Sequence, residues 1–547
     1  MTTARSARLR HALIATAGLC ACARTDAPAA ADSTSAGSSG AAASTGDGVG
    51  TSGPDGASSS GGGDEGSTTG DGDGGDDRIH ITHAFGPIDL PPMSDDVSMC
   101  ASWTLDNAKP VYVNEVEMAN LGSFHHSNWF VVPEDKFEGD DGYWPCADRG
   151  FDEINASAQG AVVLFAQSTQ SYTENQRLAA GSVVKIPERY KVVATLHTLN
   201  ASPEPSQTSL WLTLYPIHPK DVSTVVTALS IQYKDLHIPA LSEARFTANC
   251  DLGTPYWLSQ GEPLAMRLHY ILPHYHYLGN HFEVKVQGGL RDGEVVYSLD
   301  GFNGTANGLT FDPPLDLPGA TGLSVTCGYD NWRSEDIEWG NGGGEMCVML
   351  ALIDSNATMG ASVDLGNHLV DVQDGVQMYE GVCLGIALDK NPDQSMPDMT
   401  EVLAPLYLPP VDPDDQGVPP VPACQDSNPA VQPQGAATLS RVRDNVLVPY
   451  CTYSSCHGVS GAADLDLSAT DLHGELMNHE VVADVSLPLV EPGDPEGSHL
   501  YQRLARCEAV DDAGHPLSHM PYNAPFLLDD ELVALVRAWI EDGAPDN

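Results

Sequence analysis

Short apolar runs separated by Gly, Pro, Asn and Asp turns dominate the sequence from residue 80 to about residue 385. Runs such as GAVVLFAQ, YKVVATLHTL, SLWLTLYPI, HFEVKVQGG and MCVMLALI are typical of buried strands, and helical spacing of apolar positions is scarce here. About 300 residues of this kind are enough for two β-sandwiches. Because the pattern breaks near residues 225–240, we expect one sandwich at 80–232 and a second at 233–388.

The pattern changes toward the carboxy terminus. Residues 389–435 are rich in Pro and predict a stiff, extended linker. After residue 436, the segments LSRVRDNVLVPYC and LDDELVALVRAWIEDGAP have helical spacing. The second segment places five apolar residues on one stripe: Leu532, Leu535, Val536, Trp539 and Ile540. Residues 436–547 therefore predict a separate, small α-helical domain after the mainly β part.

The first 79 residues contain little that a folded core would bury. Residues 1–22 combine a basic start with a short apolar run and the sequence LCAC, which resembles a bacterial lipobox with Leu19 three residues before Cys22. This predicts a lipoprotein signal peptide cleaved before a lipid-bearing Cys22, with an ordinary secretory signal as the alternative. Residues 23–79 are rich in Gly, Ser, Ala, Thr and Asp and predict a disordered tether.

Charge and hydropathy restrict the partners. The formal net charge of -50, from 75 acidic and 25 basic residues, argues against nucleic acid and against an anionic membrane surface. No later stretch is long and apolar enough to span a bilayer, so we expect membrane contact only through a lipid anchor at Cys22. We therefore expect an exported protein at the bacterial cell envelope, periplasmic or on the cell surface, where disulfides persist.

Histidines concentrate in the predicted strands. In ILPHYHYLGNHFEV, His274 and His276 are two residues apart, so in a strand both imidazoles face one side and can bind one metal. His125 and His126 are adjacent, so joint ligation by this pair needs a β-bulge or the Nδ1 atom of one ring. His197, in VVATLHTLN, can supply a third ligand. Taken singly, each is more often a structural histidine, and the functional interpretation depends on their order.

That order resembles the copper type II ascorbate-dependent monooxygenases, the family of peptidylglycine α-hydroxylating monooxygenase and dopamine β-hydroxylase. An adjacent His pair, a lone strand His, a His-x-His and a Met in a Glu-Met-Cys stretch follow one another between residues 85 and 385. The resemblance implies two copper ions held by two sets of three residues: His125, His126 and His197 in the first, and His274, His276 and Met346 in the second. Imidazoles with a soft thioether suit copper that cycles between Cu(I) and Cu(II).

The resemblance also implies fold and activity. We expect two tandem jelly-roll-like β-sandwiches that hold the coppers on facing domains without a short bridge. The first set would store and pass one electron, and the catalytic second set would use O2 to hydroxylate a C–H bond of a small organic substrate. Electrons would come from an ascorbate-like reductant. The implied disulfides are Cys100–Cys146, Cys250–Cys383 and Cys327–Cys347.

The chain departs from the family at positions that contact substrate. Peptide-processing members have an Arg where this chain has Leu272, and Asn and Tyr where it has Val348 and Leu350. A glycine-extended peptide is therefore disfavoured as substrate, and a less polar molecule is favoured.

The carboxy-terminal domain carries a second resemblance. PYCTYSSCHGVSG places Cys451, Cys456 and His457 in a C-x4-C-H arrangement, and the later segment LSHMPYNAPF contains Met520. These segments resemble small c-type cytochrome domains of exported bacterial proteins, which implies haem attached at the two cysteines with His457 and Met520 as iron ligands. The usual attachment motif is C-x2-C-H, so a Cys451–Cys456 disulfide without haem is the alternative. Cys424 and Cys507 remain and can pair with each other.

Two other functions fit the same residues. One is a non-catalytic copper-binding surface lipoprotein, and the other is a copper and haem electron-transfer protein that inserts no oxygen. The complete ligand sets favour the monooxygenase, in which a haem domain would act as the electron donor to copper.

Overall fold

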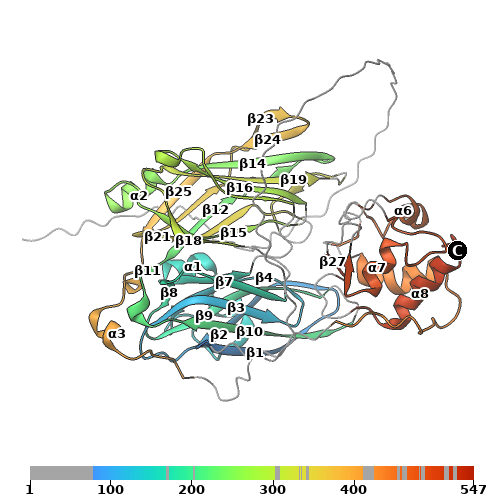
Figure 1. The fold of residues 1–547 in the computed structure, drawn as a ribbon, viewed down its shortest axis with the longest axis horizontal. Coiled ribbons are helices and arrows are strands. Elements are labelled where there is room, and N and C mark those ends of the chain that lie inside the picture. The colour runs from blue at the N-terminus through green and yellow to red at the C-terminus, as the bar shows by residue number, and fades with distance from the viewer. Residues whose placement is uncertain are drawn as a thin grey trace, which may run out of the picture. The chain divides into compact units, whose positions relative to one another are not determined.

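The computed structural model describes residues 78–547 except 168–171, 201–203, 277, 302–307, 332, 334, 341–343, 411–423, 453–455, 459–464, 480, 482–486, 511–515 and 522–526 (Figure 1). The predicted signal peptide, the anchor at Cys22 and nearly all of the predicted tether lie outside the described residues. The described part is mainly β, as the sequence predicts. None of its helices combines the length and the hydrophobicity needed to cross a membrane.

The first sandwich consists of two sheets around one apolar core. Its strands are β1 (Ile81–Leu90), β2 (Ser94–Thr104), β3 (Val111–Asn120), β4 (Phe124–Pro133), β5 (Gly142–Pro145), β6 (Val162–Gln167), β7 (Thr173–Arg177), β8 (Ser182–Ile186), β9 (Tyr190–Asn200), β10 (Ser206–Pro216) and β11 (Thr224–Val225). One sheet has the order β1-β10-β3-β8-β11, with β7 beside β3, and the other has the order β5-β2-β9-β4-β6. Short helices η1 (Cys146–Arg149) and α1 (Glu153–Ala158) lie between β5 and β6, and η2 (Pro219–Asp221) lies between β10 and β11.

Strand β4 shows why these strands read as continuous apolar runs. Trp129 and Val131 pack in the core between the two sheets, whereas Phe130 and Val132 belong to a separate apolar cluster on the other face. Successive side chains of a strand face opposite sides, so a sheet covered on both faces needs apolar residues at every position.

The second sandwich has the same two-sheet construction. Its strands are β12 (Thr227–Tyr233), β14 (Ser242–Asp251), β15 (Arg267–His274), β16 (Gly279–Gln287), β17 (Val295–Asp300), β18 (Leu309–Asp316), β19 (Gly322–Asn331), β21 (Val348–Asp354), β22 (Ala357–Val363), β23 (His368–Gln373), β24 (Val376–Glu380) and β25 (Cys383–Asp389). The sheet orders are β18-β15-β21-β12-β22-β25 and β17-β16-β19-β14-β24-β23. The short pair β13 (His237–Ile238) and β20 (Ile337–Glu338), with α2 (Gly253–Gln260) and η3 (Gly289–Arg291), completes it.

The change from the first to the second sandwich falls earlier than predicted. Strand β12 pairs with β21 and β22, so the second sandwich begins at Thr227 and not at residue 233. The break in the apolar pattern after Tyr233 marks the end of a second-sandwich strand, not the end of the first sandwich.

The first part of the predicted linker is packed, not extended. It contains η4 (Pro392–Gln394) and α3 (Met399–Leu403). The buried Gln394 donates from Nε2 to the carbonyl of Lys185 at 2.6 Å, and the Tyr407 hydroxyl accepts the Ala108 N–H at 2.9 Å. Because polar groups of this segment find partners on the first sandwich, it acts as a strap against that domain.

The carboxy-terminal residues form a helical domain with its own core. Its elements are α4 (Leu439–Val442), the π-helix η5 (Arg443–Leu447), α5 (Val448–Cys451), α6 (Leu472–Asn478), α7 (His499–Ala505), β26 (Glu508–Val510), β27 (Pro516–Ser518) and α8 (Asp530–Glu541). The predicted stripe of α8 is confirmed, since Leu535, Val536, Trp539 and Ile540 are buried in this core and Leu532 packs at its margin.

Four disulfides join described cysteines. Cys100–Cys146, Cys250–Cys383 and Cys327–Cys347 confirm the three pairings implied by the family resemblance. The fourth, Cys424–Cys507, ties the end of the linker region to the helical domain. Cys451 and Cys456 lie outside these disulfides, so the alternative of a Cys451–Cys456 bond is not what the structure contains.

A buried carboxyl group makes the stability of the first sandwich depend on pH. Glu153 is 2% exposed, and its Oε1 accepts hydrogen bonds from Asn128 Nδ2 at 2.9 Å and Thr195 Oγ1 at 3.2 Å. Burial raises the pKa of Glu153 from 4.5 to about 8. As the pH rises above 4.5, the unfolded chain loses this proton before the folded chain does, so the free energy of unfolding falls until the pH passes about 8.

Replacing Glu153 by Gln keeps the shape and removes the ionisation. We expect Glu153→Gln to raise the thermal unfolding midpoint by several degrees relative to the wild type at pH 9, with a smaller effect or none at pH 5. Calorimetry of both proteins at the two pH values checks this. An equal change at both would contradict a buried, protonated Glu153.

Candidate metal centre

A bulged strand ladder brings the first predicted ligand set together. His126 of β4 lies directly opposite His197 of β9, whereas the preceding pair is Phe124 and Thr198. One extra residue, His125, therefore stands in β4 between two successive pairs. A bulge of this kind breaks the strict alternation of side chains, and it meets the condition that the sequence set for joint ligation by adjacent histidines.

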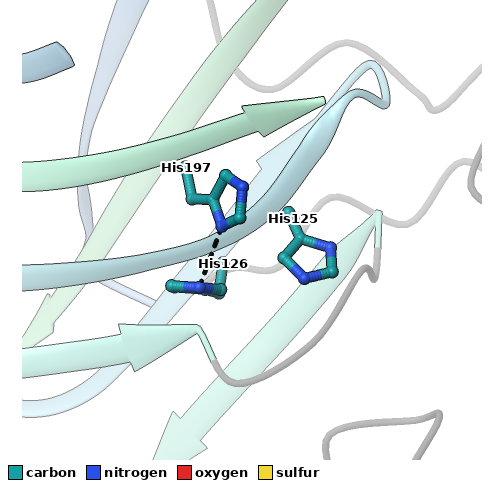
Figure 2. A group of neighbouring side chains, drawn as sticks. All are labelled: His125, His126 and His197. Atoms are coloured by element: carbon teal, nitrogen blue, oxygen red, sulfur yellow. Dashed lines mark hydrogen bonds between the residues drawn. The ribbon is translucent and has the colours of Figure 1, made fainter. Parts of the chain in front are cut away.

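The three imidazoles of this set converge (Figure 2). The nitrogen atoms that His125, His126 and His197 can offer to a metal all lie within 4.8 Å of one another. His197 Nδ1 and His126 Nε2 are hydrogen-bonded at 3.0 Å, and the His125 and His197 ring centroids are 4.6 Å apart. The structure thus unites all three residues of the first predicted set.

The surroundings keep the rings of His125 and His126 neutral. Burial, followed by the charge of His197, holds the pKa values of His125 and His126 well below 6.5. A metal ligand must be the neutral imidazole, so at neutral pH the pair needs no deprotonation before it binds a cation. On the other side of His197, Nε2 is 2.5 Å from Asp95 Oδ1.

The second predicted set lies where β15 ends and β21 begins. His274, the last residue of β15, pairs with Val348 at the start of β21, which brings His274 next to Met346. His274 Nε2 is 3.2 Å from Met346 Sδ, and the His274 and His276 ring centroids are 5.5 Å apart. His276 lies just past the strand, so the turn after β15, not the strand alternation expected from the sequence, positions its ring.

Polar contacts fix the His276 imidazole. Its Nδ1 donates to the Gly344 carbonyl at 2.8 Å, which leaves Nε2 with its lone pair. Nε2 is buried and has no hydrogen-bond partner in the described part of the chain, and burial lowers the pKa of His276 to about 3. A buried nitrogen without a partner is unfavourable, and a cation at this atom would satisfy it.

Glu345 and its neighbours hold this turn in place. The carboxyl group of Glu345, 1% exposed, accepts the backbone N–H groups of His276 and Leu278, both at 2.9 Å. Next to it, the Tyr329 hydroxyl donates to the Met346 carbonyl at 2.7 Å, and Cys347 is bonded to Cys327. The segment carrying Met346 is therefore anchored on both sides.

The two sets lie against each other, not apart. The ring centroids of His126 and His274 are 5.3 Å apart, and those of His125 and His276 are 5.8 Å apart. Tyr270, Leu272 and Leu352 of the second sandwich pack into the first sandwich's core and hold β15 and β21 against it. The family resemblance implies coppers on facing sandwiches without a short bridge. It does not predict that imidazole rings of the two sets lie this close to one another.

Two further histidines of this region and Arg267 lie apart from the two sets. His269 is fully buried and bonds Ser182 Oγ through Nδ1 at 2.9 Å, and His281 Nδ1 bonds Asp300 at 2.6 Å. Arg267, at the opposite end of β15 from His274, forms an ion pair with Asp354. These residues are structural.

In the helical domain, the structure describes all four residues of the C-x4-C-H and Met-Pro motifs. Cys451 and Met520 both pack against the domain core. The His457 N–H donates to the Cys451 carbonyl at 2.8 Å, so the two residues lie close together. Burial raises the pKa of the Cys451 thiol to about 12, so this thiol is protonated at neutral pH.

Two residues of the centre had no distinct signal in the sequence. Asp95 belongs to an ordinary polar pair in a strand, and its contact with His197 depends on the pairing of β2 with β9. Glu345 lies inside the Glu-Met-Cys stretch, but in the sequence only Met346 of that stretch was assigned a role, as a metal ligand. Only the folded chain reveals that Asp95 contacts the His197 ring and that Glu345 contacts the backbone of the turn that carries His276.

Comparison with known proteins gives no family. No protein-family model and no curated protein matches the sequence. The major capsid protein P2 from bacteriophage PM2 is 8% identical, with 51% of this chain and 97% of that chain covered and a TM-score of 0.21. The Cowpea mosaic virus top component is 7% identical, with 51% and 89% covered and a TM-score of 0.25. The PBSX exported protein XepA is 8% identical, with 50% and 86% covered and a TM-score of 0.14. Likenesses this distant carry no argument about the metal centre.

The anchoring role of Glu345 can be tested separately from the ligands. Glu345→Ala leaves two buried N–H groups without their acceptor, at about 1–3 kcal/mol each, and releases the turn that carries His276. We expect a lower thermal unfolding midpoint and loss of the metal bound by the second set, with the first set still loaded.

Glu338→Ala is the matched control, because the Glu338 side chain is 66% exposed and bonds only the half-exposed His237 among described residues. Metal content per chain and calorimetry check both variants. Full metal binding by Glu345→Ala would contradict the anchoring role.

Proposed function

We propose that this protein is a copper-dependent monooxygenase that hydroxylates a C–H bond of a small organic substrate with O2 and an ascorbate-like reductant. One observation carries the proposal. Six residues spread from His125 to Met346, chosen from their order in the sequence, lie in two adjacent groups. The first is a triad of imidazoles that could hold a metal, and in the second His274 lies beside both Met346 and His276. The three disulfides implied by the same resemblance add support.

The donor atoms suit copper. The first set offers three imidazoles, and the second offers two imidazoles and a thioether, a combination that favours copper over zinc. Copper held there would supply one-electron chemistry and activation of O2. The protein's own contribution is to keep the imidazoles neutral, to fix the His276 tautomer through Gly344 and to exclude water, since five of the six side chains are buried.

The positions that grip peptide substrates in the resembling family have another role here. Leu272 is 1% exposed and packs into the core of the first sandwich, and Val348 is fully buried. Neither can bind a substrate carboxylate. This supports a less polar substrate than a glycine-extended peptide.

As a second element of the proposal, the helical domain would bind haem like a c-type cytochrome and donate electrons to the copper. Cys451 and Cys456 remain outside the four disulfides, and Met520 packs on the same core as Cys451. The extra two residues of C-x4-C-H must bulge for both sulfurs to reach a haem. The disulfides also support an exported protein in an oxidising compartment, whereas the lipid anchor at Cys22 is proposed from the sequence alone.

One observation favours the alternative of a copper-binding surface protein without turnover. Two cavities of the described chain lie away from the histidines, one lined by Arg267 and Asp354 and the other by Glu134 and Asp393. With the ligands largely buried, a substrate would need an opening of the contact between the two sets.

Copper loading separates these functions. We expect the full chain to bind two coppers, and His197→Ala and His274→Ala each to bind about one. O2 consumption with ascorbate and a panel of apolar substrates should fall to the level of the copper-free protein in both variants. His237→Ala, which removes a half-exposed histidine outside the centre, is the control. Two bound coppers without O2 consumption would favour the non-catalytic alternative.

Absorption spectroscopy tests the haem. Full chain made in a host that matures c-type cytochromes should show a c-type Soret band, and the double variant Cys451→Ala, Cys456→Ala should lose it. Cys424→Ala with Cys507→Ala is the matched control, since it removes a cysteine pair outside the motif. A wild-type protein that binds copper but shows no Soret band would leave the helical domain without this role.

A further inference from the structure

A carboxylate lies behind one ligand of the first set. Asp95 Oδ1 is 2.5 Å from His197 Nε2, and the Asp95 side chain is 29% exposed while that of His197 is 4% exposed. Asp95 pairs with Leu199 of β9, so it lies diagonally across the ladder from His197 on the same face. The contact thus joins the buried imidazole to a partly solvated anion.

The backbone prepares this contact. In the β2–β9 pair, Asp96 faces Thr198 and Met99 faces Leu196, so two residues of β2 stand opposite the single His197. His197 therefore lies between two bulges, this one in β2 and the one at His125 in β4. Bulges re-aim side chains next to functional sites.

The hydrogen bond decides the tautomer of His197. A carboxylate only accepts hydrogen bonds, so Nε2 carries the proton that Asp95 receives. The neutral ring then has its lone pair on Nδ1, the atom 3.0 Å from His126 Nε2. Only Nδ1 of His197 is left to bind a metal.

We propose that Asp95 is a positioning residue of the first set, which fixes the His197 ring with Nδ1 toward the metal and stabilises the more highly charged Cu(II) over Cu(I). Carboxylate partners of metal-binding histidines orient the ring and raise its basicity. An anion interacts more strongly with the higher charge, so Asp95 lowers the reduction potential of this copper. This inference rests on the part of the proposed function that places copper at His125, His126 and His197, and not on hydroxylation.

Two substitutions separate orientation from charge. Asp95→Asn keeps an oxygen that accepts the Nε2 proton and removes the charge, whereas Asp95→Ala removes both. Asp96→Asn is the matched control, because Asp96 Oδ1 bonds only Ser98 N and Oγ, at 2.7 and 2.6 Å, among the hydrogen bonds of the described chain.

Each full-length variant is measured for five quantities: its Cu(II) affinity, its Cu(I) affinity, the reduction potential of the copper, the EPR spectrum and the thermal unfolding midpoint. We expect Asp95→Ala to weaken one of the two coppers about 10–100-fold, and Asp95→Asn to weaken Cu(II) more than Cu(I) and raise the potential of that copper. Asp96→Asn should match the wild type. The second copper should be unchanged in all three.

The outcomes distinguish the two proposals. A wild-type protein that binds no copper at the first set would overturn the proposed function and this inference with it. If the wild-type protein binds copper there and both Asp95→Ala and Asp95→Asn keep the same copper affinity, reduction potential and EPR spectrum, only the role of Asp95 is overturned. If Asp95→Ala fails to fold, Asp95→Asn decides the question through its potential.

Discussion

The pairing of β4 with β9 is the constraint on which the candidate metal centre depends. A regular strand places neighbouring side chains on opposite faces, which would send His125 and His126 apart. One extra residue in β4 cancels that alternation locally, and direct pairing of His126 with His197 brings the third ring alongside. The rest of the first sandwich, with its two sheets and continuous apolar core, holds this short irregular stretch in register. The ligand set is thus a property of the ladder and not of a flexible loop.

The second set is built by a different device. His276 and Met346 both lie outside the strands, where backbone groups lack ladder partners and must be satisfied otherwise. Glu345 supplies two acceptors to the His276 turn, and the Cys327–Cys347 disulfide and Tyr329 fix the residues around Met346. In the second set, a disulfide and side-chain hydrogen bonds position the ligand residues, whereas strand pairing positions them in the first set.

Sequence reasoning predicted the features that leave a local pattern. Apolar runs predicted the strands, helical spacing predicted α8, and the family resemblance implied the three disulfides that the structure contains. The order of the His and Met residues predicted two sets of possible metal ligands, and the structure brings residues of each set together. It placed the boundary between the two sandwiches too late. The sequence of β12 is typical of any buried strand, and only its pairing with β21 and β22 shows that it belongs to the second sandwich. It missed the packed strap around Gln394 and the contacts of Asp95 and Glu345, since these depend on long-range pairing that no local pattern encodes.

The two sets differ in a way that gives an electron a direction if copper occupies both. The first set has imidazole ligands only, with the anion of Asp95 bonded to His197, and both features favour the higher charge of Cu(II). The second set includes the Met346 thioether, a soft ligand that favours Cu(I). Copper held in both sets would therefore have a lower reduction potential in the first set than in the second, and the two sets lie close together, with the His126 and His274 ring centroids 5.3 Å apart. His125 and His126 are neutral at physiological pH, because their pKa values lie well below 6.5. The difference in reduction potential between the two sets would therefore come from the Asp95 carboxylate and the Met346 sulfur, and not from a change in the protonation of these two histidines.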